Sequence, residues 1–87
     1  MASEDRLLID WDALLFIEAL PRQQGRLLRQ RLLEICEYPN RFGDFEEPDL
    51  KRRPLSVHIY REFAIWFWHD FNDRHVKVLR IGWADRA

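Results

Sequence analysis

The side chains best suited to chemistry are three histidines, His58, His69 and His75, all in the C-terminal half of the chain. An imidazole has an ordinary pKa of about 6.5, so it can donate or accept a proton around neutral pH. His58 attracts most interest because it falls within an alternating apolar segment, beside Tyr60 and close to Arg61. Histidines at strand edges are more often plain surface residues, so a structural interpretation stays open beside that of a general acid or base.

A second group of side chains is cationic. Three consecutive basic residues precede Pro54 in a predicted turn, where they could hold phosphate oxygens at the rim of a sheet. Arginine suits phosphate because its planar guanidinium donates two hydrogen bonds at once. A turn is equally a place where charge is easily solvated. The candidate nucleic-acid-binding residues are Lys51, Arg52, Arg53 and Arg80, and Arg61 and Arg86 could complete a cationic strip.

Apolar and aromatic side chains offer a third kind of surface. Tryptophans in the C-terminal segments can stack on nucleobases, although on a sheet they more often belong to a core or an interface. Leu14 and Leu15 fall on the flank and back of a predicted helix, where they can pack under the sheet or meet a partner. The candidate partner-binding residues are Leu14, Leu15, Trp66, Trp68 and Trp83.

Several kinds of site have no signature in the sequence. We find no glycine-rich phosphate loop, no metal-ligand cluster and no Ser/His/Asp spacing above chance. The single cysteine, Cys36, lies in an apolar helical pattern and cannot form an internal disulfide, so we expect a buried, unreactive thiol. Neither a metal nor a cofactor is expected.

Length and composition limit the fold and the location. The 87 residues, 47% of them hydrophobic, suit a single domain over residues 1–87. No apolar run approaches the roughly 18 residues of a membrane span, and the acidic N-terminus lacks the basic region of a signal peptide. We expect a cytoplasmic protein without membrane contact. The net charge of −1 is uneven, since residues 51–87 carry eight basic and four acidic side chains.

The N-terminal half shows helical spacing of apolar residues. After a short strand at residues 7–9, Asp12 is the candidate N-cap of a helix over residues 13–20. Pro21 ends that helix and is tolerated at the start of the next, which spans residues 22–38. The short connection predicts an antiparallel helical hairpin.

From residue 44 the apolar period changes from helical to alternating. Short turns between alternating segments predict an antiparallel meander of three to four strands, with the helices covering one face in an α+β arrangement. The predicted strands cover residues 44–47, 55–60, 63–68 and 76–83.

The last predicted strand has a divided pattern. Val76 and Val78 point one way, whereas Leu79 and Ile81 point the other. The division indicates either a β-bulge or a strand that is apolar on both faces.

Short segments across nearly the whole chain carry a family resemblance. They include Trp11-Asp12-Ala13, Ala19-Leu20-Pro21 and Glu37-Tyr38-Pro39, which fall at the ends of the predicted helices. The strongest portion runs from Asp44-Phe45 through residues 53–59, 63–70 and 76–81 to residues 84–86. In combination they resemble the RelE/ParE superfamily of toxins, whose fold is a short N-terminal strand, an antiparallel helical hairpin and a β-meander.

The resemblance implies a toxin of a type II toxin–antitoxin system, neutralised by a cognate antitoxin through an amphipathic helix. RelE-like members are ribosome-dependent mRNA endoribonucleases that use basic residues of the sheet and the preceding loop. ParE-like members lack that set and poison DNA gyrase. The resemblance therefore leaves two possible targets, ribosome-bound mRNA and DNA gyrase. A homodimer is also possible.

Carried onto this chain, the ribonuclease set is incomplete. The run Lys51-Arg52-Arg53 falls in the basic loop, and Arg86 falls at the late arginine that faces the scissile phosphate in RelE-like proteins. Phe63 stands near the place of another family arginine, which Arg61 replaces only if the register slips. The chain also stops at Ala87, without the terminal Tyr or His of active ribonucleases.

Three functions follow from the resemblance. The first is a ParE-like toxin that acts by binding a cellular target, since a near-neutral protein offers RNA little counterion release. The alternative is a RelE-like ribonuclease, with His58 as base, Arg86 stabilising the phosphorane charge and Arg61 beside them. The third is an inactive relative that serves as a protein-binding module.

Overall fold

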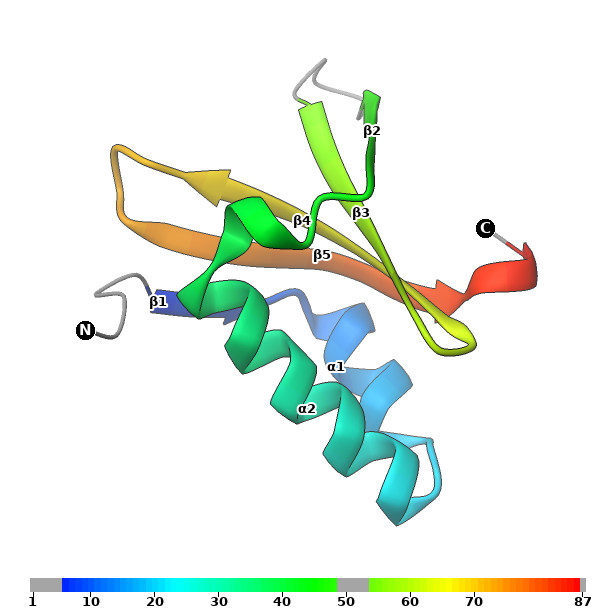
Figure 1. Ribbon diagram of the computed structural model, residues 1–87. Coiled ribbons are helices and arrows are strands. Elements are labelled where there is room, and N and C mark those ends of the chain that lie inside the picture. Colours follow the sequence, from blue (N-terminus) through cyan, green and yellow to red (C-terminus); the bar gives the residue numbers. More distant parts are fainter. Residues whose placement is uncertain (1–5, 49–53, 87) are drawn as a thin grey trace.

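The structure is a computed structural model that describes residues 6–48 and 54–86. It has two layers, a five-stranded sheet and a pair of helices that cover one face of it (Figure 1). One strand, two helices and four strands follow each other along the chain, in agreement with the predicted α+β fold. Among the described residues, no helix is long and apolar enough to cross a membrane.

The first strand and the first helix meet at an aspartate. β1 (Arg6–Ile9) is followed by α1 (Trp11–Glu18), and the carboxylate of Asp10 accepts a hydrogen bond from the amide of Trp11 at 2.8 Å. The prediction of Asp12 as the N-cap was therefore wrong by two residues. Asp10 is the cap because its backbone is still extended, whereas Asp12 lies in the first helical turn.

The second helix, α2 (Arg22–Glu37), runs back beside α1 and completes the hairpin (Figure 1). Pro21 separates the two helices, as predicted. The helices approach closely at Gly25, where a Cβ would lie 3.4 Å from the backbone oxygen of Ile17. The residues that α2 buries lie on one side of the helix, and they are Gly25, Leu28, Leu32, Ile35 and Cys36.

The C-terminal half forms the predicted antiparallel meander. Its strands are β2 (Phe45–Pro48), β3 (Pro54–Tyr60), β4 (Phe63–Asp70) and β5 (His75–Trp83). Two short 3₁₀ helices, η1 (Pro39–Arg41) and η2 (Ala84–Arg86), follow α2 and β5. β1 pairs in parallel with β5, which the sequence did not indicate, and the sheet order is β1-β5-β4-β3-β2.

A β-bulge explains the divided pattern of β5. The register against β4 shifts between Trp66 and Phe67, which leaves Leu79 as an extra residue. The extra residue turns Ile81 to the same face as Val78, and both are buried in the main core. Of the two predicted alternatives, the bulge is confirmed.

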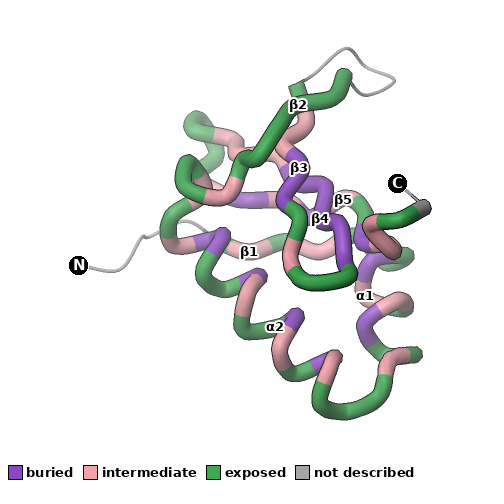
Figure 2. Tube along the Cα trace, turned by 45° about the vertical axis from the view of Figure 1, so that its right-hand side comes forward, coloured by how far each residue is buried: buried purple, intermediate pink, exposed green. Residues whose placement is uncertain are grey.

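The main core lies between the helices and the sheet, and Figure 2 shows buried residues on β3, β4 and parts of both helices. Cys36, the single cysteine of the sequence, is buried within this core, as predicted. A smaller cluster of Val57, Ala64 and Trp66 is packed on the opposite face of the sheet, which we call the open face. The sheet therefore has a helix-covered face and an open face with different surroundings.

Candidate functional site

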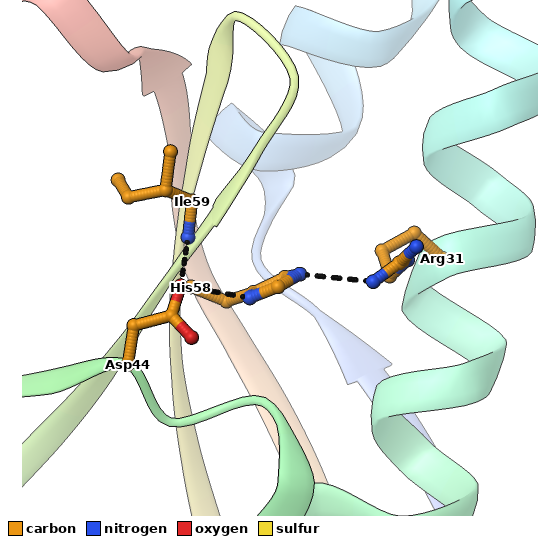
Figure 3. A network of polar contacts seen from close by, with 4 residues as sticks. All are labelled: Arg31, Asp44, His58 and Ile59. Atoms are coloured by element: carbon orange, nitrogen blue, oxygen red, sulfur yellow. Dashed lines mark hydrogen bonds and ion pairs between the residues drawn. The ribbon is translucent and has the colours of Figure 1, made fainter.

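His58 lies on the helix-covered face of β3, where only 7% of the residue is exposed. Its ring points from the sheet toward α2 (Figure 3). Nδ1 lies 3.1 Å from Oδ2 of Asp44, and Nε2 lies 3.2 Å from Nη1 of Arg31. The same oxygen of Asp44 accepts the backbone amide of Ile59 at 2.8 Å. Three segments that are distant in the sequence therefore meet at one imidazole.

The chemistry of its two partners fixes the tautomer of His58. A guanidinium can only donate, so Nε2 accepts from Arg31, and a carboxylate can only accept, so Nδ1 carries the proton given to Asp44. Burial lowers the pKa of His58 below its ordinary value of 6.5, and although Asp44 raises this pKa, the charge of Arg31 lowers it further. His58 is thus a neutral ring with both nitrogens engaged.

Two aromatic rings hold the guanidinium of Arg31. Its central carbon lies 4.2 Å from the ring centroid of Tyr60 and 5.0 Å from that of Phe42. Phe42 also meets the His58 ring edge to face at 5.1 Å, and Oε1 of Glu34 lies 3.3 Å from Nε of Arg31. Arg31 therefore ties α2 to β3 through a cation fixed in position.

Of the candidate catalytic residues, the structure connects Arg61 with His58 through Tyr60. Arg61 is exposed in the turn after β3, with φ of 56°, and its Nε donates to the Tyr60 hydroxyl at 3.3 Å. The amide of Ala84 donates to the carbonyl of the residue after Arg61, at 2.8 Å, so η2 begins beside the same turn. Arg86 ends η2, and its side chain lies outside the described part of the structure.

Two of the candidate cations, Arg61 and Arg80, lie on different faces of the sheet. The guanidinium of Arg80 lies over the ring of Trp66 at 4.4 Å, on the open face, whereas Arg61 contacts Tyr60 on the helix-covered side. The basic run Lys51-Arg52-Arg53 lies outside the described residues. The predicted cationic strip is thus divided where the structure describes it.

The three sheet tryptophans do not share one surface either. Trp66 is buried on the open face, and its Nε1 donates to Oε2 of Glu47 at 3.0 Å. Trp68, two residues along β4, is partly buried on the same face. Trp83 packs toward the helices, with its ring centroid 5.7 Å from that of Phe16. Trp83 therefore belongs to the packing around the main core.

An apolar groove of about 260 Å³ lies between β1 and the two helices. Leu14 lines this groove, as does Leu33, which is 61% exposed. Leu15 is exposed on α1, one turn from Trp11, which is 66% exposed. Sequence reasoning missed Trp11 and Leu33 as surface residues because helical spacing alone does not show which apolar margin stays uncovered. The lining residues are Leu7, Ile9, Leu14, Ile17, Arg29, Leu32 and Leu33.

A group of acidic and imidazole side chains that the sequence did not indicate lies at the turn between β4 and β5. One ligand atom from each of Asp70, Asp73 and His75 lies within 4.8 Å of the others. Oδ1 of Asp70 accepts from the amides of Asn72 and Asp73, at 3.0 and 3.1 Å, as in an Asx turn. Turn formation therefore accounts for the position of Asp70.

Comparison with known proteins gives a fold but no close relative. No family model and no curated protein match the sequence. The intact RelBE toxin–antitoxin complex of E. coli matches with a TM-score of 0.69 at 20% identity, over 92% of this chain and 96% of that chain. The chain has the RelE toxin fold.

Two further structures share the RelE fold. The RelE–RelB complex of Pyrococcus horikoshii matches with a TM-score of 0.70 at 19% identity, over 95% of this chain and 98% of that one. The isolated E. coli RelE toxin matches with a TM-score of 0.69 at 22% identity, over 95% of this chain and 87% of that one. The predicted order of strand, helical hairpin and meander is thereby confirmed as a RelE fold.

Proposed function

We propose that this protein is the toxin of a type II toxin–antitoxin pair, that a cognate antitoxin neutralises it, and that it acts by binding a cellular target as ParE-like toxins do. The RelE fold supports the general class, and two of the similar structures are complexes of RelE with RelB. DNA gyrase is the first target to examine, because the resemblance to ParE-like toxins points there.

The observation that carries the proposal is the apolar groove between β1, α1 and α2. Leu33 is exposed along it and Leu14 is partly exposed, so an amphipathic antitoxin helix laid in the groove would bury apolar surface of both. Arg29 stands at the same groove and forms an ion pair with Glu18 at 3.5 Å. The rim thus offers a cation that an acidic residue of such a helix can meet.

The surroundings of His58 support binding over RNA cleavage. A general base needs a nitrogen within reach of the 2′-hydroxyl whose proton it removes. Both nitrogens of His58 are instead engaged, one by Asp44 and the other by Arg31. The RelE-like alternative, in which His58, Arg61 and Arg86 act together, therefore requires Arg31 to leave the ring first.

A binding experiment with matched variants tests the groove. The probe is the purified product of the neighbouring gene, and Leu14→Glu and Leu33→Glu each place a carboxylate in the groove. We expect each to weaken binding on the order of tenfold or more, the typical cost of losing a buried interface anchor. Phe71→Glu is the control, because Phe71 is 70% exposed in the turn after β4, and it should bind as the wild type does. Binding that survives both groove substitutions contradicts this interface.

Two activity assays separate the three functions. The ParE-like proposal is supported if the protein inhibits supercoiling by gyrase in one assay and leaves ribosome-bound transcripts uncut in the other. Cut transcripts, with cutting lost in Arg61→Ala, would establish the ribonuclease instead. Groove-dependent binding without either activity would identify the inactive binding module.

A further inference from the structure

Arg31 is a cation held between a helix and a sheet. Its Nη1 donates to Nε2 of His58 at 3.2 Å, and its guanidinium lies over Tyr60 at 4.2 Å and over Phe42 at 5.0 Å. Only 25% of the Arg31 side chain is exposed. The contact with His58 is a direct polar link from α2 to β3, and it depends on one lone pair of the ring.

Protonation of His58 reverses this contact. The neutral ring keeps its proton on Nδ1, facing Asp44, so a second proton enters at Nε2. Nε2 then becomes a donor on a positive ring, 3.2 Å from a donor nitrogen of Arg31. A charge-assisted hydrogen bond is replaced by repulsion between two cations in a partly buried place.

Two carboxylates decide which partner moves. Asp44 keeps the ring in place, because an imidazolium bonds a carboxylate more strongly than a neutral imidazole does. Glu34 lies on the same helix as Arg31, with Oε1 already 3.3 Å from Nε. Its side chain is 47% exposed, so it offers the displaced guanidinium an acceptor nearer to solvent.

We propose that His58 is a proton-operated latch: when the ring gains a proton, Arg31 leaves it and α2 is uncoupled from β3. The latch opens as the pH falls and closes as it rises. It involves no catalytic step and does not rest on the proposed function.

The charged and titratable groups near the ring set the pH at which the latch opens. Among the described residues they are Arg31 and Glu34 on α2, Asp44 before β2, Tyr60 on β3, and Arg61, which bonds the Tyr60 hydroxyl. Burial of His58 and the charge of Arg31 lower the pKa of the ring, whereas Asp44 and Glu34 raise it. Together these effects lower the pKa of His58, so the latch opens at a pH below 6.5.

Nuclear magnetic resonance of the ¹⁵N-labelled protein tests the latch. The imidazole nitrogen shifts report the tautomer and midpoint of His58, and the side-chain protons of Arg31 carry a ring-current shift from Tyr60 and Phe42. We expect the Nδ1–H tautomer at neutral pH and loss of the Arg31 ring-current shift with the midpoint of His58.

Two variants separate the latch from general acid unfolding. In His58→Gln, the amide oxygen can accept from Arg31 and does not titrate, so the Arg31 shift should persist across the same pH range. In Arg31→Met, the apolar stem remains while the neighbouring charge is gone, so the midpoint of His58 should move upward. An Nε2–H tautomer at neutral pH, an Arg31 shift that ignores the His58 midpoint, or an unchanged midpoint in Arg31→Met would each overturn the proposal.

Discussion

His58 is buried as a neutral ring, and this ties the stability of the fold to pH. The unfolded ring titrates at the ordinary value of 6.5, whereas the pKa of the folded ring is lower. Between the two values the unfolded state binds more protons, so acid favours unfolding. Above 6.5 both states hold the ring neutral, and the contribution of His58 to stability is fully present.

The wild type should therefore lose stability relative to His58→Gln as the pH falls through 6.5 toward the pKa of the folded ring. One proton changes the free energy of unfolding by at most about 1.4 kcal/mol per pH unit. Urea unfolding of both proteins at a series of pH values measures the difference, and His75→Gln is the control for loss of a histidine from the sheet. Parallel pH profiles for wild type and His58→Gln would contradict the burial of a neutral ring.

At the scale of elements, the start of α1 depends on Asp10. Its carboxylate accepts from the amide of Trp11, whereas Asp12 lies in the first turn and contributes through the helix dipole. Asp10→Ala should lower the free energy of unfolding by about 1 kcal/mol, the usual cost of losing an N-cap. Asp12→Ala should cost less. Equal costs in thermal or urea unfolding would show that the cap had been assigned to the wrong aspartate.

The bulge in β5 leads to a second prediction at the scale of elements. Ile81 lies in the main core with Val78, whereas Leu79, the extra residue, is partly exposed. Ile81→Ala should cost about 2–5 kcal/mol of stability, as large-to-small core substitutions do, and Leu79→Ala about 1 kcal/mol or less. A regular strand would place these two residues on one face, so similar losses for both would argue against the bulge.

At the scale of the whole molecule, the spacing of apolar residues was sufficient to predict the helical and sheet layers, but not how the strands pair within the sheet. Helical and alternating spacing correctly predicted the hairpin and the meander, because each period depends on which face of one element is buried. The four residues of β1 do not indicate which strand β1 will pair with, because its parallel pairing with β5 arises only when the sheet assembles. The bulge at Leu79 could be offered only as one of two alternatives for the same reason.

At the candidate site, too, the sequence indicated single residues but not how they come together. Sequence reasoning singled out His58, but its partners Arg31 and Asp44 come from a helix and a connecting segment whose approach no local pattern encodes. Trp66 and Trp83 looked alike in the sequence, yet they pack on opposite faces of the sheet. Side-chain chemistry was therefore easier to predict than the grouping of side chains.

We propose that this protein, which has the RelE fold, is a toxin neutralised by a partner. Growth of a bacterial culture after induced expression, with and without the neighbouring gene, tests it most directly. We expect expression of this chain alone to arrest growth, and coexpression of the neighbouring gene to restore it. Normal growth at good soluble expression of this chain alone would contradict the claim and leave a binding module in its place.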